Sequence, residues 1–228
     1  MTITFRALAA LLAYPDDGLV AALPEIRAVV EAEPQLGKKE KAALNALVDE
    51  IGAGDPLDAQ ERYVEMFDRG RSTSLHLFEH VHGDSRDRGT AMLDLKGIYE
   101  RAGLALTANE LPDYLPAVLE FLSTQPFATT EEMLGDCAHI LRALGEALQE
   151  RASPYAAVPA ALLSLVRQPG LGAVKRDAPV RGEKSIDEEW IEEPVIFGPA
   201  GAPGGCGSAR SQPQSSIVQF MPRTGMPR

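Results

Sequence analysis

The fold class is decided by the stretch TTEEMLGDCAHILRALGEAL, residues 129–148. Its first four residues match a capping box, in which hydroxyl and carboxylate side chains satisfy the free amides of a helix start. Apolar residues then recur at spacings of three and four, at Leu134, Cys137, Leu141, Leu144 and Leu148. This period places them on one face of an α-helix, so the stretch predicts one amphipathic helix that packs against others.

The same helical period continues outward from this stretch over most of residues 1–169, and no convincing alternation typical of strands is present. Helix starts are indicated by Asp16 and by Asp55 before Pro56, and a helix end by Gly103. Pro24 is expected to kink or restart the second helix. Further helices are expected to begin at Ser72 or Ser74, at Asp84, after Asp113 and at Ser153. We therefore predict an all-α fold, a single compact domain of eight or nine helices over residues 1–169.

The composition changes after Pro169. Residues 170–228 contain nine Gly and seven Pro, which is typical of a flexible linker. We predict a mostly disordered C-terminal tail. The segment at 187–197 contains Trp190, the only Trp of the chain, among acidic residues. It is read either as a short docking motif that folds on binding or as a solvated acidic tail with incidental aromatic residues.

The charge is strongly acidic, with 22 Lys and Arg against 33 Asp and Glu, a formal net charge of −11 and a pI of about 4.9. The seven basic and seven acidic residues of 170–228 cancel, so the whole excess lies in residues 1–169. Unaided nucleic-acid binding is excluded by this balance, because phosphates require a clustered cationic face. A cationic partner is favoured instead.

Three features that the sequence lacks indicate the cellular compartment of the protein. The two cysteines, Cys137 and Cys206, lie in different regions and match no zinc-finger spacing, which favours a reducing environment. The N-terminus lacks the pattern of a signal peptide, and no run of about 18 apolar residues is present. We expect a soluble cytoplasmic protein without membrane insertion.

The densest polar segment is LHLFEHVHGDSRDRG, residues 75–89. His76 and His80 are four residues apart, as in helical zinc sites, so a metal-dependent hydrolase that uses them with Glu79 is one reading. The other is that these histidines lie at a helix end and bond to backbone or carboxylate groups. The alternating charges at 84–88 fit either a clasp between helices or a ligand contact.

Aromatic and apolar residues flanked by carboxylates surround this segment. Tyr63, Met66 and Phe67 precede Asp68, and Leu111–Pro116 contains further examples. Such a set suits a groove for an amphipathic basic helix, with apolar anchors buried and cations at the rim. The alternative is that most of these aromatic residues belong to the core.

Several of these segments also resemble a known family. They are YVEMFDRGRSTSL at 63–75, LFEHVHGDSRDRG at 77–89, AMLDL at 91–95, ELPD at 110–113 and the surroundings of Trp190. They are similar to the nitrate reductase delta subunit, a redox-enzyme maturation chaperone for molybdenum cofactor assembly in respiratory nitrate reductase. The resemblance covers about residues 5–200.

The resemblance implies an all-helical cytoplasmic chaperone that is not an enzyme. Its partner would be the twin-arginine-like N-terminal leader of the catalytic alpha subunit. The chaperone would keep that subunit competent for insertion of the molybdenum–guanine dinucleotide cofactor, alongside cofactor biosynthesis proteins, and would delay docking to the membrane. The family binds no cofactor stably itself. A related chaperone for a selenate or chlorate reductase is an alternative.

The resemblance and the groove together predict a client-peptide site and no catalytic or metal-binding residue. The predicted site residues are Tyr63, Met66, Phe67, Asp68, Leu75, Phe78, Glu79, His80, His82, Asp84, Arg86, Asp87, Arg88, Asp113 and Tyr114.

Overall fold

The computed structural model describes residues 2–82, 86–106 and 110–172. Within these residues the chain forms ten α-helices, two short 3-10 helices and one isolated bridge, so the predicted all-α class is confirmed. The α-helices are α1 (Thr2–Leu11), α2 (Asp17–Ala32), α3 (Lys38–Ile51), α4 (Pro56–Phe67), α5 (Leu77–His82), α6 (Arg86–Arg101), α7 (Leu115–Ser123), α8 (Phe127–Asp136), α9 (Ala138–Glu150) and α10 (Ala157–Leu165). The 3-10 helices are η1 (Arg71–Thr73) and η2 (Pro154–Ala156).

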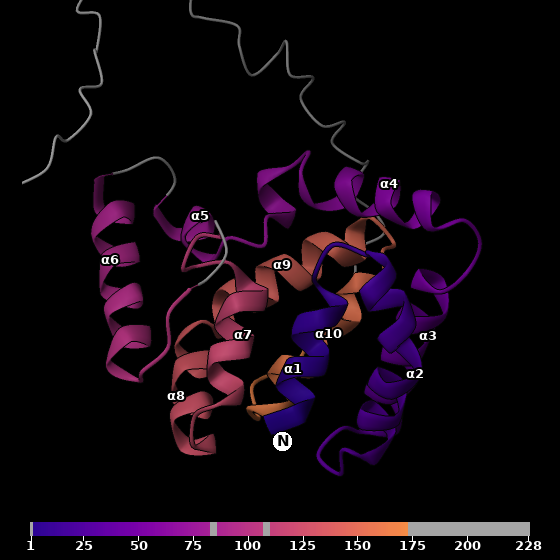
Figure 1. Ribbon diagram of the computed structural model, residues 1–228, viewed down its shortest axis with the longest axis horizontal. Coiled ribbons are helices and arrows are strands. Elements are labelled where there is room, and N and C mark those ends of the chain that lie inside the picture. Colours follow the sequence, from indigo (N-terminus) through magenta and orange to yellow (C-terminus); the bar gives the residue numbers. More distant parts are fainter. Residues whose placement is uncertain (1, 83–85, 107–109, 173–228) are drawn as a thin grey trace, which may run out of the picture. The chain divides into compact units, whose positions relative to one another are not determined.

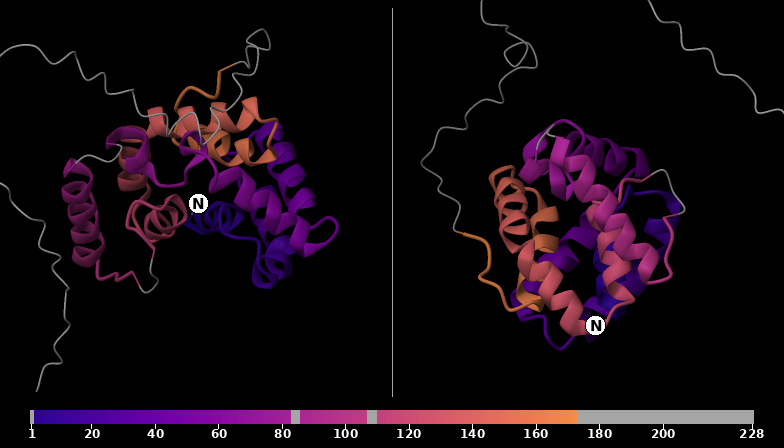
Figure 2. Two further views of the ribbon diagram at one scale, coloured as in Figure 1. Left: turned by 90° about the horizontal axis from the view of Figure 1, so that it is seen from above. Right: turned by 90° about the vertical axis from the view of Figure 1, so that its left-hand side faces the viewer.

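Helix α1 packs mainly against α7 and α2, while α10 packs against α9 and α3 (Figure 1). Helix α6 lies at the edge of the helical unit that is opposite α2 and α3, as both the front view and the view from above show (Figures 1 and 2). Its contacts are chiefly with α5. Helix α5, which also contacts α9 and η1, therefore connects α6 to the rest of the helical unit.

The core is built from the apolar faces that the helical period predicts. Leu8, Leu44, Leu119, Leu144 and Leu162, from five different helices, are completely buried. Burial of such a side chain contributes about 1.5–3 kcal/mol relative to exposure. These contacts join residues far apart in sequence, so they fix the positions of the helices that carry the site.

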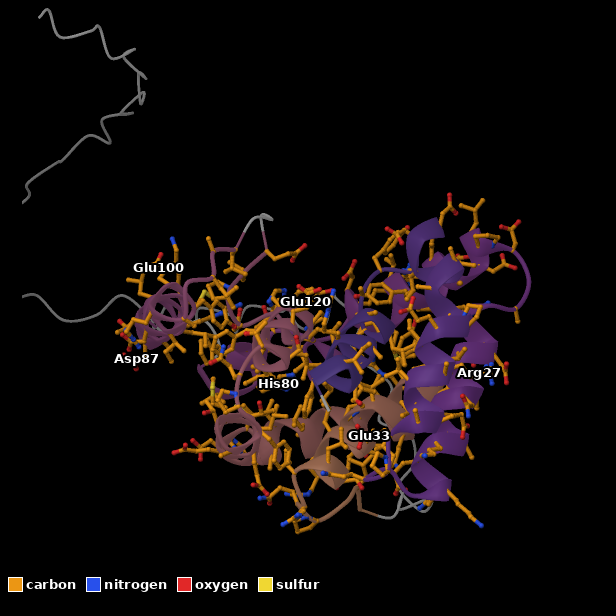
Figure 3. All side chains as sticks on the ribbon, turned by 60° about the horizontal axis from the view of Figure 1, so that its bottom comes forward. Arg27, Glu33, His80, Asp87, Glu100 and Glu120 are labelled. Carbon is orange, nitrogen blue, oxygen red and sulfur yellow. The ribbon has the colours of Figure 1, made fainter. Side chains whose placement is uncertain are left out.

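A carboxylate is buried where α1 meets the end of α2. Glu33, at the end of α2, is 3% exposed and accepts a hydrogen bond of 2.6 Å from the Thr4 hydroxyl (Figure 3). Burial disfavours its charge, but the hydrogen bonds from Thr4 and from the backbone amide of Gln35 outweigh burial and lower the pKa of Glu33. This pair ties α1 to the end of α2.

Three predicted helix boundaries are confirmed. The Asp16 carboxylate accepts a hydrogen bond of 2.8 Å from the Leu19 amide at the start of α2. Asp55 does the same for the Leu57 amide at 2.9 Å, with Pro56 as the first residue of α4. Gly103 follows α6 with φ of +76°, the left-handed conformation that favours glycine.

The stretch at 129–148 differs from its prediction in two respects. The helix begins earlier, at Phe127, because Pro126 provides the turn and the Thr130 hydroxyl donates to the carbonyls of Leu122 and Pro126 rather than capping. The stretch also forms two helices, because the backbone of Cys137 (φ −86°, ψ 1°) ends α8 and begins α9. This break accounts for one additional helix beyond the predicted number.

Two further helix boundaries differ from their predictions. Of the kink or restart expected at Pro24, the restart does not occur, because α2 continues to Ala32 with Leu19, Leu23, Ile26 and Val30 buried on one face. The helix expected at Ser72 or Ser74 is divided into η1 and α5. The predicted cap Asp84 lies outside the described residues.

No helix among the described residues is long and apolar enough to cross a membrane. The predicted tail begins at residue 170, and the description ends at Gly172. The docking motif at 187–197 and Cys206 therefore lie outside the described residues and stay predictions.

Candidate functional site

Helix α5 is held in place by a segment that lies 35 residues further along the chain. The Asp113 side chain is fully buried and accepts a hydrogen bond of 3.1 Å from the Phe78 amide. The Asp113 carbonyl accepts another from the Leu77 amide, also at 3.1 Å. Beside them, His76 and Tyr114 form the isolated antiparallel bridge, and the Leu115 amide donates to the Leu75 carbonyl. Asp113 thus caps α5 from another part of the chain.

The Asp113 carboxylate also pairs with a histidine. Its Oδ1 lies 3.4 Å from Nδ1 of His76, whose ring stacks at a tilt on Tyr114 with centroids 5.4 Å apart. The hydrogen bond to Asp113 raises the pKa of His76, against the opposing effect of burial. Burial opposes ionisation of Asp113, but the hydrogen bonds from His76 and Phe78 outweigh it and lower the pKa of Asp113.

The shifts within this pair predict a pH dependence of stability. Because the pKa of His76 is raised above its usual 6.5, its stabilising effect is complete below pH 6.5 and is lost as the pH rises through the folded value. The pKa of Asp113 is lowered below its usual 3.8, so the stabilisation from this carboxylate is complete above pH 3.8 and is lost as the pH falls through the folded value. We expect the free energy of unfolding, measured by urea denaturation, to fall as the pH rises above 6.5.

The matched variant for this prediction is His76→Gln, which keeps a polar side chain but cannot titrate. We expect this variant to lose the part of the pH slope above 6.5. An equal slope in the wild-type chain and in His76→Gln would contradict the assignment of the effect to His76.

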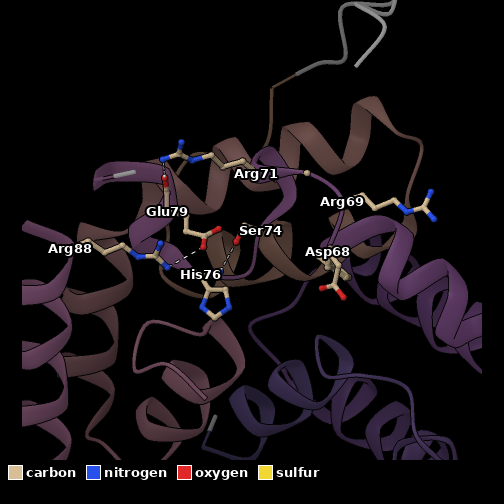
Figure 4. A pocket seen from close by; sticks show the side chains of 9 residues that line it. Asp68, Arg69, Arg71, Ser74, His76, Glu79 and Arg88 are labelled. Carbon is tan, nitrogen blue, oxygen red and sulfur yellow. Dashed lines mark hydrogen bonds and ion pairs between the residues drawn. The ribbon is translucent and has the colours of Figure 1, made fainter. Parts of the chain in front are cut away.

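A pocket of about 490 Å³ opens beside this pair, between the end of α4, η1, α5 and the start of α6 (Figure 4). Its lining consists of Phe67, Asp68, Arg69, Gly70, Arg71, Ser74, His76, Glu79 and Arg88. We call it the α5 pocket. Charged side chains predominate in it, and they come from helices on both sides of the link to α6.

Glu79 and Arg88 join the two sides of the α5 pocket. An Arg88 nitrogen lies 3.0 Å from Oε1 of Glu79, and Arg71 donates to the Glu79 carbonyl at 3.2 Å. Burial disfavours the Glu79 carboxylate, but hydrogen bonds from Ser74 and Arg88 outweigh this effect and lower its pKa. Glu79 is therefore neutralised by Arg88, whereas Asp68 at the pocket edge is exposed and forms no ion pair among the described residues.

An aromatic cluster adjoins the α5 pocket through Phe67, which belongs to both. The ring of Tyr63 contacts those of Tyr14, Phe67 and Tyr155, with centroids 4.8–6.2 Å apart. The Tyr63 hydroxyl donates to the Leu12 carbonyl at 2.9 Å. It also lies 3.1 Å from the hydroxyl of Tyr114. Burial raises the pKa of Tyr63, so the phenol stays neutral and acts as a fixed hydrogen-bonding group.

Comparisons with known proteins identify the family. The profile of the nitrate reductase delta subunit family matches residues 33–160, which include the whole α5 pocket. The chain belongs to this family. It is 42% identical to the nitrate reductase molybdenum cofactor assembly chaperone NarJ of Escherichia coli K12, over 87% of this chain and 85% of the relative. NarW of the same strain is 40% identical, over 84% and 82%.

A solved structure from Archaeoglobus fulgidus, described as a redox enzyme maturation protein, shares the fold. Its TM-score is 0.53 at 20% identity, and the match covers 74% of this chain and 94% of that one. These relatives are named as chaperones or maturation proteins and not as enzymes. The prediction that this chain is a chaperone of the delta subunit family is thereby confirmed.

The structure brings only some of the predicted site residues of this family member together. Phe67, Asp68, Glu79 and Arg88 line the α5 pocket. Four others support it rather than line it: Tyr63, Leu75 and Asp113 are buried, and Tyr114 is half-buried against His76.

The remaining predicted residues lie around the pocket or outside the description. Met66, Phe78 and His80 are half-buried, and Asp87 is exposed on α6 (Figure 3). The side chains of His82 and Arg86 and the whole of Asp84 are outside the described part of the chain.

Pocket residues that the sequence did not single out are Arg69, Gly70, Arg71 and Ser74. Arg151 was also missed, although it supports the pocket from the end of α9. Its guanidinium donates to the Thr73 hydroxyl at 2.8 Å and to the Met66 carbonyl at 3.4 Å. Gly70 leaves room for it, since a Cβ there would lie 2.9 Å from Arg151 Nη2. No local sequence signal marks a contact across 78 residues.

The two histidines considered as metal ligands have other partners. His76 bonds to Asp113, and Nε2 of His80 lies 2.8 Å from the Ser74 carbonyl. Among the side chains that the structure describes, no group of three or more His, Cys, Asp or Glu is arranged to hold a metal ion.

Proposed function

We propose that this member of the delta subunit family is a cytoplasmic chaperone of respiratory nitrate reductase. It binds the N-terminal leader of the catalytic alpha subunit, keeps that subunit competent for insertion of the molybdenum–guanine dinucleotide cofactor and delays its docking to the membrane. The observation that carries the proposal is the 42% identity to the E. coli assembly chaperone over 87% of this chain. The cofactor belongs to the client, so the proposal needs no cofactor site on the chaperone.

The charge of the chain supports a leader with arginines as the ligand. The net charge of −11 lies wholly in residues 1–169, which contain all the helices described. An acidic surface raises the association rate of a cationic peptide and makes its binding sensitive to salt. The negative electrostatic potential of residues 1–169 thus attracts a cationic peptide before any direct contact forms.

The proposed site is the α5 pocket and its surroundings. Asp68 offers an exposed carboxylate at the pocket edge, while Phe67 and the half-buried Phe78 offer apolar surface. Glu79 is paired with Arg88, so Asp68 is the carboxylate of this lining that an arginine of the leader would meet, beside Arg69 and Arg71. The fifteen residues predicted from the sequence thus remain the proposed client-peptide site, with Tyr63, Leu75 and Asp113 as buried supports.

We expect the full-length chain to bind a synthetic leader peptide of the alpha subunit in isothermal titration calorimetry. Affinity should fall about tenfold as the salt concentration rises from about 0.05 to about 0.5 M, because attraction between exposed charges is screened. The matched control is the same peptide with its arginines replaced by glutamine, whose weaker binding should vary little with salt. An absence of binding at low salt would count against leader recognition.

The cellular form of this test uses the client itself. The tagged full-length chain should recover the catalytic subunit from cells that express it with its leader, and recover much less of it when the leader is deleted. Equal recovery of both forms would contradict the leader as the recognised segment.

A further inference from the structure

The outer face of α4 carries apolar side chains that no part of the described chain covers. Leu57 is 69% exposed and Val64, seven residues later on the same side of the helix, is 37% exposed. Tyr14, from the turn between α1 and α2, is 46% exposed and lines one hollow together with Val64. Two of the large exposed apolar side chains therefore lie at this hollow, and Leu57 extends the same side of α4 beyond it.

The opposite face of α4 attaches the helix to the core. Ala59, Tyr63 and Phe67 are buried at spacings of four, and the Tyr63 ring contacts Tyr14 from the inside with centroids 5.7 Å apart. Helix α4 is thus anchored by one face, and its exposed apolar residues are not required to hold it in place. Single apolar residues on a surface are ordinary, but a stripe beside a hollow indicates a contact surface.

Carboxylates flank this stripe. Asp58, Glu61 and Glu65 on α4 and Asp68 directly after it are exposed, and none of them forms an ion pair or a side-chain hydrogen bond among the described residues. By contrast, Arg62 on the same helix is engaged, since it lies near Glu50 and donates to its carbonyl. Four acidic groups that have no partner in the described part of the chain thus lie near the exposed apolar side chains.

A second hollow lies along this face and adjoins the α5 pocket. Its volume is about 290 Å³, and its lining is Tyr14, Gln60, Glu61, Val64, Glu65 and Arg69. Arg69 also lines the α5 pocket, so the two hollows meet at this residue. We call the outer stripe and this hollow together the α4 face. A peptide longer than the α5 pocket would reach the α4 face next.

The charge of the α4 face determines what fits it. A second copy of the chain would place one set of four carboxylates against another, and each copy carries a net charge of −11. Like charges across an interface are costly, so self-association through this face is disfavoured. A partner with basic residues beside apolar ones would satisfy both the carboxylates and the exposed apolar side chains.

We propose that the α4 face is a second docking surface for the client leader, whose cationic, amphipathic segment extends there from the α5 pocket. The inference rests on the proposed function. Leu57, Val64 and Tyr14 receive the apolar side chains of the leader, and Glu61, Glu65 and Asp68 receive its basic ones. Leu57, Glu61, Val64 and Glu65 do not line the α5 pocket, so substitutions at these positions change the α4 face without replacing a residue of that lining.

The electrostatic part of the proposal is tested with the double variant Glu61→Lys/Glu65→Lys of the full-length chain. We expect its affinity for the leader peptide to fall about tenfold at low salt, with a smaller difference at high salt. The matched control is Glu132→Lys/Asp136→Lys on α8, which reverses two exposed acids at the same spacing of four and changes the net charge equally. The control should lose much less affinity.

The apolar part is tested with Leu57→Ser/Val64→Ser. We expect a loss of about tenfold that is the same at low and high salt, since apolar contacts are not screened. The control is Ile3→Ser/Leu93→Ser, which removes two side chains that are 54% and 71% exposed on α1 and α6. Circular dichroism melts of all four variants should match the wild-type chain, because every substituted residue is exposed.

The outcomes separate this inference from the proposed function. If the wild-type chain does not bind the leader, the proposed function fails. If the wild-type chain binds the leader and both α4 variants bind it as tightly as their controls, only the proposal on the α4 face is overturned. Sedimentation that shows a wild-type dimer, dissociated by Leu57→Ser/Val64→Ser without any change in leader affinity, would identify a second copy as the occupant and would also overturn the proposal.

Discussion

We expect Asp113→Ala to lower the free energy of unfolding by about 3 kcal/mol, the cost of removing one partner from a buried, charge-assisted network. The carboxylate is fully buried and serves both the Phe78 amide and His76. Its removal leaves the amide without an acceptor at the start of α5 and leaves His76 without its anion. The variant should also bind the leader more weakly, because α5 forms one side of the α5 pocket.

Urea denaturation of the full-length chain measures this effect. Asp68→Ala is the matched control, because Asp68 is exposed and has no ion pair among the described residues, so its loss should change stability by less than about 0.5 kcal/mol. Asp113→Asn keeps one acceptor for the Phe78 amide, so its loss in the free energy of unfolding should lie between those of Asp113→Ala and Asp68→Ala. A loss below about 1 kcal/mol for Asp113→Ala would show that the cap is not essential to α5.

Tyr99→Ala is expected to cost about 3–5 kcal/mol, as for other large aromatic residues removed from a core. Tyr99 is 3% exposed on α6, and its ring contacts Phe121 of α7 with centroids 4.6 Å apart. Its hydroxyl donates to the Pro112 carbonyl at 2.7 Å, next to Asp113. One side chain therefore connects the outlying α6 both to the central helices and to the segment that caps α5.

Hydrogen exchange distinguishes a local from a global effect of this substitution. Because α6 has few contacts other than those with α5, we expect its amides to lose protection in Tyr99→Ala before those of α1 or α9. Tyr99→Phe keeps the ring and loses one hydrogen bond, so it should cost only about 1 kcal/mol. Equal losses in the two variants would mean that the hydroxyl, and not the ring, attaches α6.

Much of the fold followed from local patterns. The caps Asp16 and Asp55 and the left-handed Gly103 were predicted because each acts within a few residues of its own backbone. The apolar faces were predicted because a helical period of 3.6 residues is independent of what the helix packs against. These are features whose physical cause lies inside a single helix.

The features that were missed depend on distant contacts. Asp113 looked like the start of the helix that follows it, but its side chain caps α5 instead. Thr130 looked like part of a capping box, but a hydrogen bond to the carbonyl of Leu122 places it inside the helix. In both cases a nearby polar side chain has several possible acceptors or donors, and tertiary packing selects among them.

The α5 pocket shows the same division. Phe67, Asp68, Glu79 and Arg88 were predicted because they lie in segments that resemble the family. Arg71 lies in the same segments, but nothing local indicated that it would bond to the Glu79 carbonyl. The α4 face was missed because Leu57 and Val64 have a spacing that is also typical of buried residues on a helix. Only the packing of the helices shows that these two side chains are exposed.

The hydrogen bonds of Arg151 determine when the α5 pocket can form during synthesis of the chain. Arg151 reaches back 78 residues to Thr73 and 85 residues to Met66. Contacts of such sequence separation require closure of a long loop and form only after both ends exist. The contacts by which Arg151 supports the α5 pocket can therefore form only after residue 151 has left the ribosome, when most of the described helices have already been synthesised.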